Sequence, residues 1–373
     1  MSSAGFDVAI LGAGVAGCAT ALALHSAGIS SVVVIEAGSA TCADWIGESL
    51  PPDIATPLKT LGLWAAFRAD AHEPCLGSCA AWGSPQLGYN DFLANVNGVG
   101  WHIHRPRFDA LFRRAVAALG LPIRFNTRLS GAERLTLEGC FRLALHAPDG
   151  KSTILARHVV DATGTRGSFA SRMGARSVRH DLLVFLTATA VLPPGAWPSR
   201  MTMTETVADG WWYAAALPGN RVSLAFATDP AISRTLRLDR TAEWLDALSM
   251  TRHIGPRLGR CPVELEAFAV RAVPVCQREN PCGARWIAVG DAAATFDPLG
   301  SEGIYKALDD GIHAAAVLAA APCDHAERAA EYAAYVAANT QNHLALRRHF
   351  YALERQWPGS PFWERRQRPE RAI

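Results

Sequence analysis

A glycine-rich turn near the start of the sequence limits the fold more than any other feature. Residues 8–17 read VAILGAGVAG, so an apolar strand leads into a GxGxxG pattern formed by Gly12, Ala13, Gly14, Val15, Ala16 and Gly17. In such a turn the first glycine permits a tight bend, the second lets the backbone approach a pyrophosphate, and the third packs a helix against the strand. The helix N-terminus adds partial positive charge. The turn predicts a parallel α/β sheet that binds a dinucleotide, although glycines that serve only helix–strand packing would give the same pattern.

The strand that follows supplies an acidic residue at a suitable distance. Residues 31–35 (SVVVI) form a second buried strand, and Glu36 comes directly after it, nineteen residues after Gly17. A carboxylate at this place accepts hydrogen bonds from ribose hydroxyl groups. We therefore predict that Glu36 and Ala37 bind the cofactor together with the glycine turn.

A distant second segment favours FAD over NAD as this cofactor. Residues 286–308 read WIAVGDAAATFDPLGSEGIYKAL, and Asp291 is expected to close a strand, where its carboxylate can bind a ribityl chain. A turn shaped by Pro298, Gly300 and Gly303 would then lie against a flat ring. The helix that begins near Gly303 and Ile304 would direct its positive end at the flavin pyrimidine edge. The alternative for Asp291 is a plain helix N-cap.

Composition excludes several other classes of protein. Half of the 373 residues are apolar and the net charge is only +2, so nothing points to nucleic acid or a membrane surface as partner. The nine cysteines have no zinc-like spacing, so we expect free thiols, no metal and a cytoplasmic location. Asp7 stands where a signal peptide needs positive charge, and outside the nucleotide-binding unit no apolar run is long enough to span a membrane.

The segment between the two cofactor motifs predicts a second domain. Residues 42–97 look like loops and short helices, whereas residues 182–191 and 211–227 carry clustered β-branched and aromatic residues typical of an antiparallel sheet. We expect an FAD-binding domain of residues 1–74, 101–175 and 270–322, a substrate-binding domain of residues 75–100 and 176–269, and a C-terminal helical segment of residues 323–373.

The C-terminal stretch is rich in arginine and aromatic residues. Residues 347–373 contain seven arginines against three glutamates, with tryptophan, tyrosine and phenylalanine interleaved. Such a tail could dock an acidic protein through arginine–carboxylate pairs. We favour the alternative, a solvated helix that packs through its aromatic side chains.

Five motifs, taken in order, resemble flavoproteins of the aromatic-hydroxylase and tryptophan-halogenase superfamily. They are the glycine turn, Gly47-Glu48-Ser49-Leu50-Pro51, Arg105-Pro106-Arg107-Phe108-Asp109, Asp161-Ala162-Thr163-Gly164 and Gly290–Ile304. The resemblance implies a Rossmann-like FAD-binding domain of the glutathione-reductase type with an inserted antiparallel-sheet domain. It also places Gly47, Glu48 and Ser49 near the flavin, Arg105 at its ribityl or phosphate region, and Ala162 and Gly164 on the adenosine side.

Departures from the superfamily pattern narrow the activity. Tryptophan halogenases carry a catalytic lysine in the stretch that corresponds to residues 75–83, where this chain has none, and a glutamate where this chain has Gly300. Halogenation is therefore disfavoured. Single-component hydroxylases carry an aspartate that helps to bind NADPH where this chain has Thr163. Reducing equivalents would then come from NAD(P)H that binds transiently or from a separate flavin reductase.

The resemblance implies an FAD-dependent monooxygenase. In this reaction reduced flavin and O2 form a C4a-hydroperoxide that hydroxylates an electron-rich aromatic group. The subgroup that is most similar oxidises a tryptophan of a partner protein during maturation of quinone cofactors, as indicated by residues 47–52 (GESLPP), 210–213 (GWWY) and 357–363 (WPGSPFW). Two alternatives stay open: a halogenase or reductase/dehydrogenase of the same fold that acts on a small molecule, and a non-catalytic flavoprotein that binds a partner.

Few side chains are required when the flavin carries the chemistry, so the catalytic candidates are limited. Glu302 lies in the turn expected beside the flavin ring, and His102 and His104 alternate as in a strand, so each is a candidate acid or base. Their alternatives are a helix N-terminal carboxylate and structural histidines. The predicted substrate pocket consists of Trp82, Trp211, Trp212 and Tyr213, which could instead belong to the core.

Overall fold

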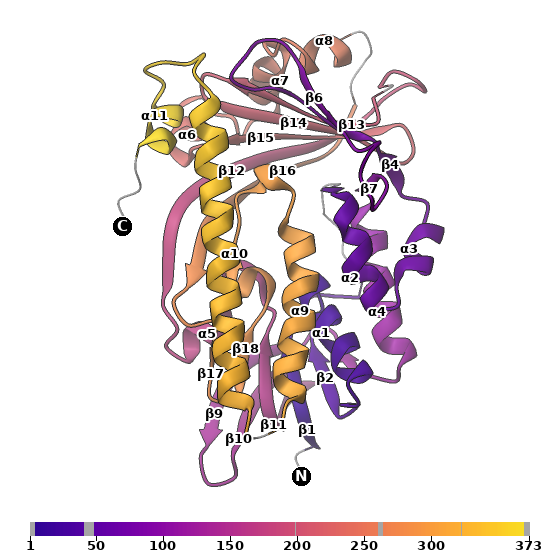
Figure 1. Ribbon diagram of the computed structural model, residues 1–373, viewed down its shortest axis with the longest axis vertical. Helices are drawn as coiled ribbons and strands as arrows, with labels where there is room; N and C mark the ends of the chain where they lie inside the picture. The colour runs from indigo at the N-terminus through magenta and orange to yellow at the C-terminus, as the bar shows by residue number, and fades with distance from the viewer. Residues whose placement is uncertain (1–3, 41–47, 198, 260–263, 322, 369–373) are drawn as a thin grey trace.

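The strands of the protein form two large sheets, and one long helix runs beside both of them. The computed structural model describes residues 4–40, 48–197, 199–259, 264–321 and 323–368. These residues form two eight-stranded sheets and one three-stranded sheet. In Figure 1 the first large sheet lies in the lower half, the second lies across the top, and α10 (His325–Leu353) runs beside both.

The first sheet has the parallel core that the glycine turn predicts. Its strand order is β17-β18-β11-β1-β2-β8, and every pair from β18 to β8 is parallel. The antiparallel strands β10 and β9 are added along β11. The bounds are β1 (Ala4–Leu11), β2 (Val32–Ile35), β8 (Ile123–Arg124), β9 (Arg128–Leu135), β10 (Cys140–Ala147), β11 (Gly150–Asp161), β17 (Cys282–Gly283) and β18 (Trp286–Ala288).

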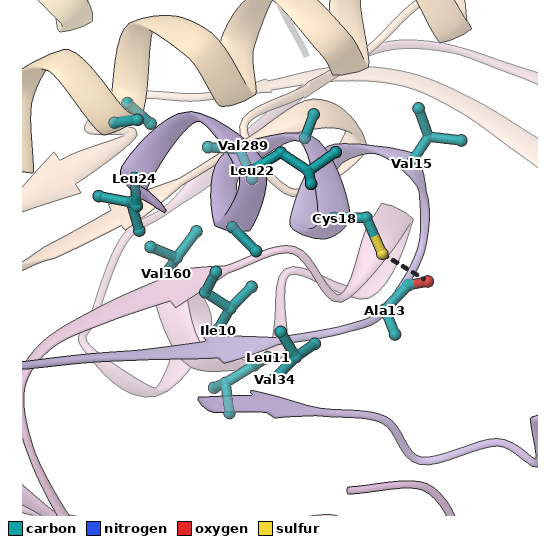
Figure 2. Packing of buried hydrophobic residues seen from close by; sticks show 14 of the residues in the cluster. Ile10, Leu11, Ala13, Val15, Cys18, Leu22, Leu24, Val34, Val160 and Val289 are labelled. Atoms are coloured by element: carbon teal, nitrogen blue, oxygen red, sulfur yellow. Dashed lines mark hydrogen bonds between the residues drawn. The ribbon is translucent and has the colours of Figure 1, made fainter. Parts of the chain in front are cut away.

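Packing of α1 (Val15–Ser26) on this sheet fixes the glycine turn in place. Figure 2 shows Leu22 and Leu24 of the helix above Ile10 and Val160 of the strands, and all four side chains are buried. Burial of each such side chain contributes roughly 1.5–3 kcal/mol. On the other side of α1, α9 (Gly303–Ala319) approaches so closely that a Cβ on Gly311 would lie 2.9 Å from the backbone nitrogen of Thr20.

The second sheet is antiparallel apart from one pair. Its order is β19-β16-β12-β15-β14-β13-β5-β6, and only β13 and β5 run parallel. The bounds are β5 (Gly77–Ala81), β6 (Gly88–Asp91), β12 (Ser177–Val191), β13 (Met201–Val207), β14 (Gly210–Leu217), β15 (Arg221–Thr228), β16 (Glu264–Arg278) and β19 (Ala294–Thr295). The predicted fold class is confirmed, whereas the domain boundaries stay a prediction.

The interpretation of residues 42–97 as loops and short helices is only partly right. This region also contributes strands β5 and β6 to the second sheet and two strands to the small sheet, whose order is β3-β7-β4. The sequence did not predict these strands, because they are short, contain few apolar residues and pair with partners elsewhere in the chain. The small sheet consists of β3 (Glu48–Leu50), β4 (Glu73–Cys75) and β7 (Gly100–Ile103).

The remaining helices cover the sheets and the C-terminal end. Helices α7 and α8 lie over the outer face of the second sheet, at the top of Figure 1, and α11 lies against the end of α10. The C-terminal region is helical, as predicted. The bounds are α2 (Ala55–Thr60), α3 (Trp64–Ala69), α4 (Arg105–Ala118), α5 (Ser168–Arg172), α6 (Pro230–Thr235), α7 (Thr241–Ser249), α8 (Ile254–Leu258) and α11 (Pro361–Gln367).

Neither a membrane-spanning helix nor a metal cluster is found in the described part of the chain. None of the helices there is long and apolar enough to cross a bilayer. The same residues contain no group of three or more histidine, cysteine, aspartate or glutamate side chains arranged to hold a metal ion.

Candidate cofactor and substrate site

The turn between β1 and α1 leaves backbone N–H groups open to a ligand. Gly12 has a φ of +113°, and a Cβ there would lie 2.2 Å from the carbonyl oxygen of Ala162. A Cβ on Gly17 would lie 2.0 Å from the carbonyl oxygen of Gly12, so both positions require glycine. Helix α1 begins at Val15, its N-cap Gly14 offers no side-chain cap, and the space beside Gly14 is empty. The N-terminus of α1 can therefore accept a phosphate group.

Glu36 supports the same turn from the end of β2. One oxygen of its carboxylate, Oε2, accepts a hydrogen bond from the backbone N–H of Ala13 at 2.7 Å. The other oxygen, Oε1, accepts from the backbone N–H of Gly38 at 2.7 Å. Its carboxylate is thereby oriented at the carboxyl ends of the parallel strands, where α/β sheets bind nucleotides.

The second cofactor motif is attached to the first by a close backbone approach. Gly290 has a φ of +59°, and a Cβ there would lie 2.8 Å from the Cβ of Ala16. The buried Lys306 of α9 donates to the carbonyl oxygen of Gly290 at 2.8 Å and to Asp310 Oδ2 at 2.6 Å. The same Asp310 oxygen accepts from the backbone N–H of Gly290 at 2.9 Å. A buried ion pair on α9 therefore fixes both peptide groups of Gly290.

Asp291 does not close a strand as expected. Strand β18 ends at Ala288, and Asp291 lies in the short 3-10 turn Gly290–Ala292 that follows. Its side chain is exposed and lines a cavity between the sheets. Removal from bulk water raises the pKa of this carboxyl, and the positive charge of Lys306 opposes that rise.

Glu48 and Arg105 form the opposite side of this region. Arg105 forms ion pairs with Glu48 at the start of β3 and, through Nε at 2.8 Å, with Asp109 Oδ1 on α4. Desolvation raises the pKa of the Glu48 carboxyl even though the Arg105 guanidinium lowers it. Glu48 lines the cavity and Arg105 does not, and the two carboxylates paired with Arg105 compensate the charge of its guanidinium.

Two adjoining cavities lie between the sheets. The inner cavity has a volume of about 260 Å³, and its polar wall contains Glu48, Asp291, Asp297, Thr187 and Arg271. The outer cavity has a volume of about 590 Å³, and its aromatic side chains are Trp82, Tyr89, Phe92, Trp211, Tyr213 and Phe350. The residues that line both cavities are Ser49, Trp211, Tyr213, Pro298 and Ser301, so these five form the shared wall.

A chain of polar side chains leads from the shared wall into the interior. The Tyr213 hydroxyl lies 2.7 Å from Ser49 Oγ, and Ser49 Oγ lies 2.7 Å from Thr202 Oγ1. Thr202 Oγ1 in turn lies 3.2 Å from Nε2 of His102. Burial raises the pKa of the Tyr213 phenol and lowers the pKa of His102 to about 4. At neutral pH the phenol is therefore protonated and the imidazole is uncharged.

Comparison with known proteins decides the family. Residues 5–338 match the model of a family described as FAD binding domain. The chain belongs to this FAD-binding family. It is 27% identical over 368 residues to the Marinomonas mediterranea protein named "Putative FAD-dependent oxidoreductase LodB", covering 97% of this chain and 96% of that protein. It is 25% identical over 351 residues to the flavin-dependent halogenase armH4 of Armillaria mellea, covering 84% of this chain and 65% of that protein.

Solved structures share the fold of this FAD-binding protein. CmlS, a flavin-dependent halogenase, superimposes with a TM-score of 0.89 at 22% identity, covering 100% of this chain and 68% of that chain. QhpG, a peptidyl tryptophan dihydroxylase essential for tryptophylquinone cofactor biogenesis, gives a TM-score of 0.72 at 24% identity, covering 98% of this chain and 79% of that chain. The predicted resemblance to the monooxygenase and halogenase superfamily is confirmed. The chain is a flavin-dependent oxidoreductase, which argues against the non-catalytic alternative.

Within this family, the structure fits FAD with the residues that the sequence selects. The open glycine turn suits the pyrophosphate, and Asp291 with the turn Pro298–Gly300 borders the cavities where the ring would lie. Contact of the individual residues with FAD stays a prediction. The predicted set is Gly12, Ala13, Gly14, Ala16, Gly17, Glu36, Ala37, Glu48, Ser49, Arg105, Ala162, Gly164, Asp291, Pro298, Gly300, Gly303 and Ile304; Gly47 lies outside the described residues.

Three of the four predicted pocket aromatics line the outer cavity, and the fourth does not. Trp82, Trp211 and Tyr213 contribute to its wall. Trp212 points to the opposite face of the sheet, where it is fully buried and stacks on Phe226 with ring centroids 4.6 Å apart. The prediction for Trp212 does not hold, because neighbouring side chains on a strand face opposite sides of the sheet.

The catalytic candidates lie outside both cavities. The side chain of Glu302 extends toward α10, where its Oε2 lies 3.2 Å from Nδ1 of His343, and it is not among the residues that line either cavity. His102 is fully buried behind the shared wall. His104 is the N-cap of α4 and does not line either cavity. None of the three lines either cavity, and their catalytic role stays a prediction.

Three of the C-terminal arginines bind internal carboxylates and form neither a solvated helix face nor a docking surface. Arg347 and Arg366 are buried and pair with the carboxylates of Asp181, Asp229 and Asp297. The half-exposed Arg365 joins Asp181 and Asp229 at 2.8 Å and 2.7 Å. Both interpretations from the sequence are therefore wrong for these three arginines, because acidic residues distant in the chain supply internal partners.

Sequence reasoning missed several cavity residues on the second sheet. Phe185 and Thr187 of β12 and Arg271 and Val273 of β16 all face the inner cavity. Each pair is separated by two positions, the period expected for one face of a strand. That period would have identified which residues share a face, although it would not have shown which face meets the cofactor. Thr202 was missed because the sequence of β13 does not indicate which of its threonines forms hydrogen bonds to side chains on β3 and β7.

Proposed function

We propose that this flavin-dependent oxidoreductase is a monooxygenase that hydroxylates an electron-rich aromatic group, with a tryptophan side chain of a peptide or protein as the first candidate. The observation that carries the proposal is the pair of adjoining cavities. The inner one meets the cofactor motifs, and the outer one is lined by six aromatic side chains. An outer cavity of about 590 Å³ falls in the usual range of ligand pockets, roughly 300–1,000 Å³.

The residues of the chain bind, orient and shield, while the cofactor carries the chemistry. FAD, when bound, would supply the activation of dioxygen, using electrons from NAD(P)H directly or through a separate flavin reductase. Trp82 and Trp211 would hold an aromatic ring by edge or offset contacts in the outer cavity. The shared wall would align that ring with the inner cavity and exclude water between them.

The names of the relatives support a substrate carried by a macromolecule without deciding it. QhpG is a peptidyl tryptophan dihydroxylase, and a brominase of Pseudoalteromonas luteoviolacea that acts on 1H-pyrrole-2-carbonyl-[peptidyl-carrier protein] is 24% identical to this chain over 331 residues. Both substrates named are aromatic rings attached to a protein or carrier. We propose the same kind of attachment here.

A halogenase is the second candidate, favoured by the match to armH4 and by the superposition on CmlS. The distribution of lysines argues against it. The chain contains only Lys59, Lys151 and Lys306, and none of them lines the outer cavity. Lys306 is bound to Gly290 and Asp310 instead. A lysine-dependent halogenation would therefore lack its lysine.

Product analysis tests the two candidates against each other. The FAD-loaded protein is reduced without oxygen, then mixed with isotopically labelled dioxygen, bromide and tryptophan-containing peptides, and the peptides are analysed by mass spectrometry. We expect a peptide that has gained labelled oxygen. A brominated peptide would establish the halogenase. Oxidation of the flavin with no change in any aromatic peptide would favour a reductase or dehydrogenase that acts on a small molecule.

A matched pair of variants links the product to the cavity. Trp82→Leu removes an aromatic side chain from the outer cavity and should lower the yield of oxygenated peptide at least tenfold. Leu137→Ser changes a fully exposed residue in the turn between β9 and β10 and should leave the yield unchanged. Equal yields for Trp82→Leu and the unaltered protein would place the substrate elsewhere.

A further inference from the structure

Three hydroxyl groups and one imidazole form a continuous buried chain behind the shared wall. In order they are Tyr213 on β14, Ser49 on β3, Thr202 on β13 and His102 on β7, with separations of 2.7, 2.7 and 3.2 Å. They come from four strands in two different sheets. Ser49, Thr202 and His102 are all at least nine-tenths buried. Tyr213 and Ser49 line both cavities, Thr202 lines the outer one as well, and His102 lines neither.

When every hydroxyl proton is donated within the chain, the chain can run in only two directions. A hydroxyl group has one proton to donate, so Ser49, with a hydroxyl group on each side, then donates to one of them and accepts from the other. If Ser49 donates to Thr202, then Tyr213 must donate to Ser49, and Thr202 can donate to His102. If Ser49 donates to Tyr213, then Thr202 must donate to Ser49, and His102 must donate to Thr202. The protonation of Nε2 on His102 is therefore coupled to the direction in which the Tyr213 hydroxyl points.

The surroundings of His102 select one of the two directions. Burial lowers its pKa to about 4, so one ring nitrogen carries a proton at neutral pH and the other does not. Nδ1 is buried and has no hydrogen-bond partner among the described residues. Buried N–H groups without a partner are rarer than buried acceptors without one. The proton therefore belongs on Nε2, which donates to Thr202.

We propose that His102 is a positioning residue that holds the Tyr213 hydroxyl as a hydrogen-bond donor facing the cavities. With Nε2 donating, Thr202 donates to Ser49, Ser49 donates to Tyr213, and the phenol proton is left free to point at a ligand. The atom that faces Tyr213 is then an acceptor, such as a carbonyl or hydroxyl oxygen of the substrate or of the oxygenated product. This last step rests on the proposed function, because it takes the cavities as the substrate site.

The position of the proton can be measured without any substrate. Full-length protein is prepared with histidine labelled at both ring nitrogens, and nitrogen chemical shifts are recorded by NMR at neutral pH, with the His102 signals identified by their loss in His102→Gln. We expect an uncharged ring with the proton on Nε2. A proton on Nδ1, or a charged ring, would overturn the proposal. This measurement does not depend on activity, so it can fail while the proposed function stands.

Variants along the chain test the coupling. Thr202→Val and Tyr213→Phe should each shift the Nε2 signal of His102, the first more than the second, because hydrogen bonds in a chain polarise one another. Thr204→Val is the matched control, since Thr204 lies two residues away on β13 and lines the outer cavity without joining the chain. It should leave the His102 signals in place. An unchanged Nε2 signal in Tyr213→Phe would show that the two ends are not coupled.

Substitution of His102 tests the effect at the cavity. His102→Gln retains an N–H donor near the position of Nε2, whereas His102→Phe removes it. We expect His102→Gln to keep most of the product formed per flavin oxidised, and His102→Phe to lose it at least fivefold while still binding FAD. Equal loss in both variants would contradict a role as donor.

Discussion

The two faces of the second sheet show how differently one strand can be used on its two sides. On the outer face, Trp212 of β14 stacks on Phe226, with the ring planes 13° apart. Its ring centroid lies 5.0 Å from that of Trp244 on α7. On the inner face, the neighbouring Trp211 lines both cavities and donates from Nε1 to the hydroxyl of Tyr351 at 3.1 Å. The outer face is apolar throughout its cluster, whereas the inner face places polar groups at fixed positions.

The inner face is closed by charge as well as by aromatic packing. The Tyr351 hydroxyl donates to Asp297 Oδ2 at 3.1 Å, and Arg347 donates from Nε to the same oxygen at 3.0 Å. Helix α10 is thus attached to Asp297 in the cavity wall by buried polar and charged groups, and removal of one partner from such a set destabilises the fold. The comparison indicates that the outer face supplies stability and the inner face supplies positions for function.

The largest loss of stability should come from removing a large side chain from the apolar outer face. Trp212→Ala should lower the free energy of unfolding by about 4–5 kcal/mol, because a fully buried indole is replaced by a cavity that the stacked rings cannot fill. Tyr213→Phe, one residue away on the inner face, should lower it by less than about 1.5 kcal/mol, the net value of a typical hydrogen bond. Denaturant unfolding of the two variants measures the difference, and similar losses would remove the distinction between the faces.

The next largest loss of stability should come from breaking the ion pairs between Arg366 and the carboxylates of Asp181 and Asp229. Arg366 is buried, with Nη2 at 2.7 Å from Asp229 Oδ1 and Nε at 2.9 Å from Asp181 Oδ2. Arg366→Met keeps much of the side-chain volume but leaves two buried carboxylates with fewer partners. We expect a loss of about 3 kcal/mol in the free energy of unfolding. The exposed Arg368, which pairs only with Glu364 one turn earlier, provides the control, and Arg368→Met should cost less than about 0.5 kcal/mol.

The ion pairs of Asp181 should make the free energy of unfolding fall at acid pH. Burial disfavours ionisation of Asp181, but the guanidinium groups of Arg366, Arg347 and Arg365 hold its pKa below the usual range. A carboxyl whose pKa is lowered by folding contributes stability above its unfolded pKa, about 3.9, and that contribution is lost as the pH falls through the folded pKa. Unfolding curves should therefore show stability falling as the pH drops below about 4, with a smaller slope in Asp181→Asn. An unchanged slope in that variant would assign the acid sensitivity to other carboxyl groups.

The parts that the sequence could predict are those whose geometry is local. The turn from Gly12 to Gly17 and Glu36 follow from strand, bend and helix within one short segment, and the structure places them together. The hydroxyl chain could not be predicted in this way, because Ser49 and Thr202 are 153 residues apart and meet only through the pairing of strands in different sheets. No local pattern records that meeting.

Side-chain direction was the other source of error. The alternation along β14 shows that Trp211 and Trp212 face opposite sides, but both sides are buried, so polarity does not identify the side that meets the cavity. The direction of the Glu302 side chain could not be predicted for a related reason. Its place in the turn before α9 was anticipated, yet its carboxylate turns toward His343 on α10, and that histidine comes 41 residues later in the chain. The arginines of the last helices likewise acquire their role only from Asp181, Asp229 and Asp297.

The smallest predicted effect separates the two tryptophans most directly. Trp211→Phe keeps an aromatic ring in the shared wall but removes the N–H that donates to Tyr351, so it should lower the free energy of unfolding by only about 1 kcal/mol. Trp212→Phe, which shortens a ring that stacks on Phe226 and meets Trp244 edge-on, should cost about 2 kcal/mol through the space it leaves. Measured together by denaturant unfolding, the pair compares the same substitution on the two sides of one strand. If Trp211→Phe proves the costlier change, the inner face is the structural one, and its aromatic residues are there to hold α10 and α11 rather than to receive a substrate.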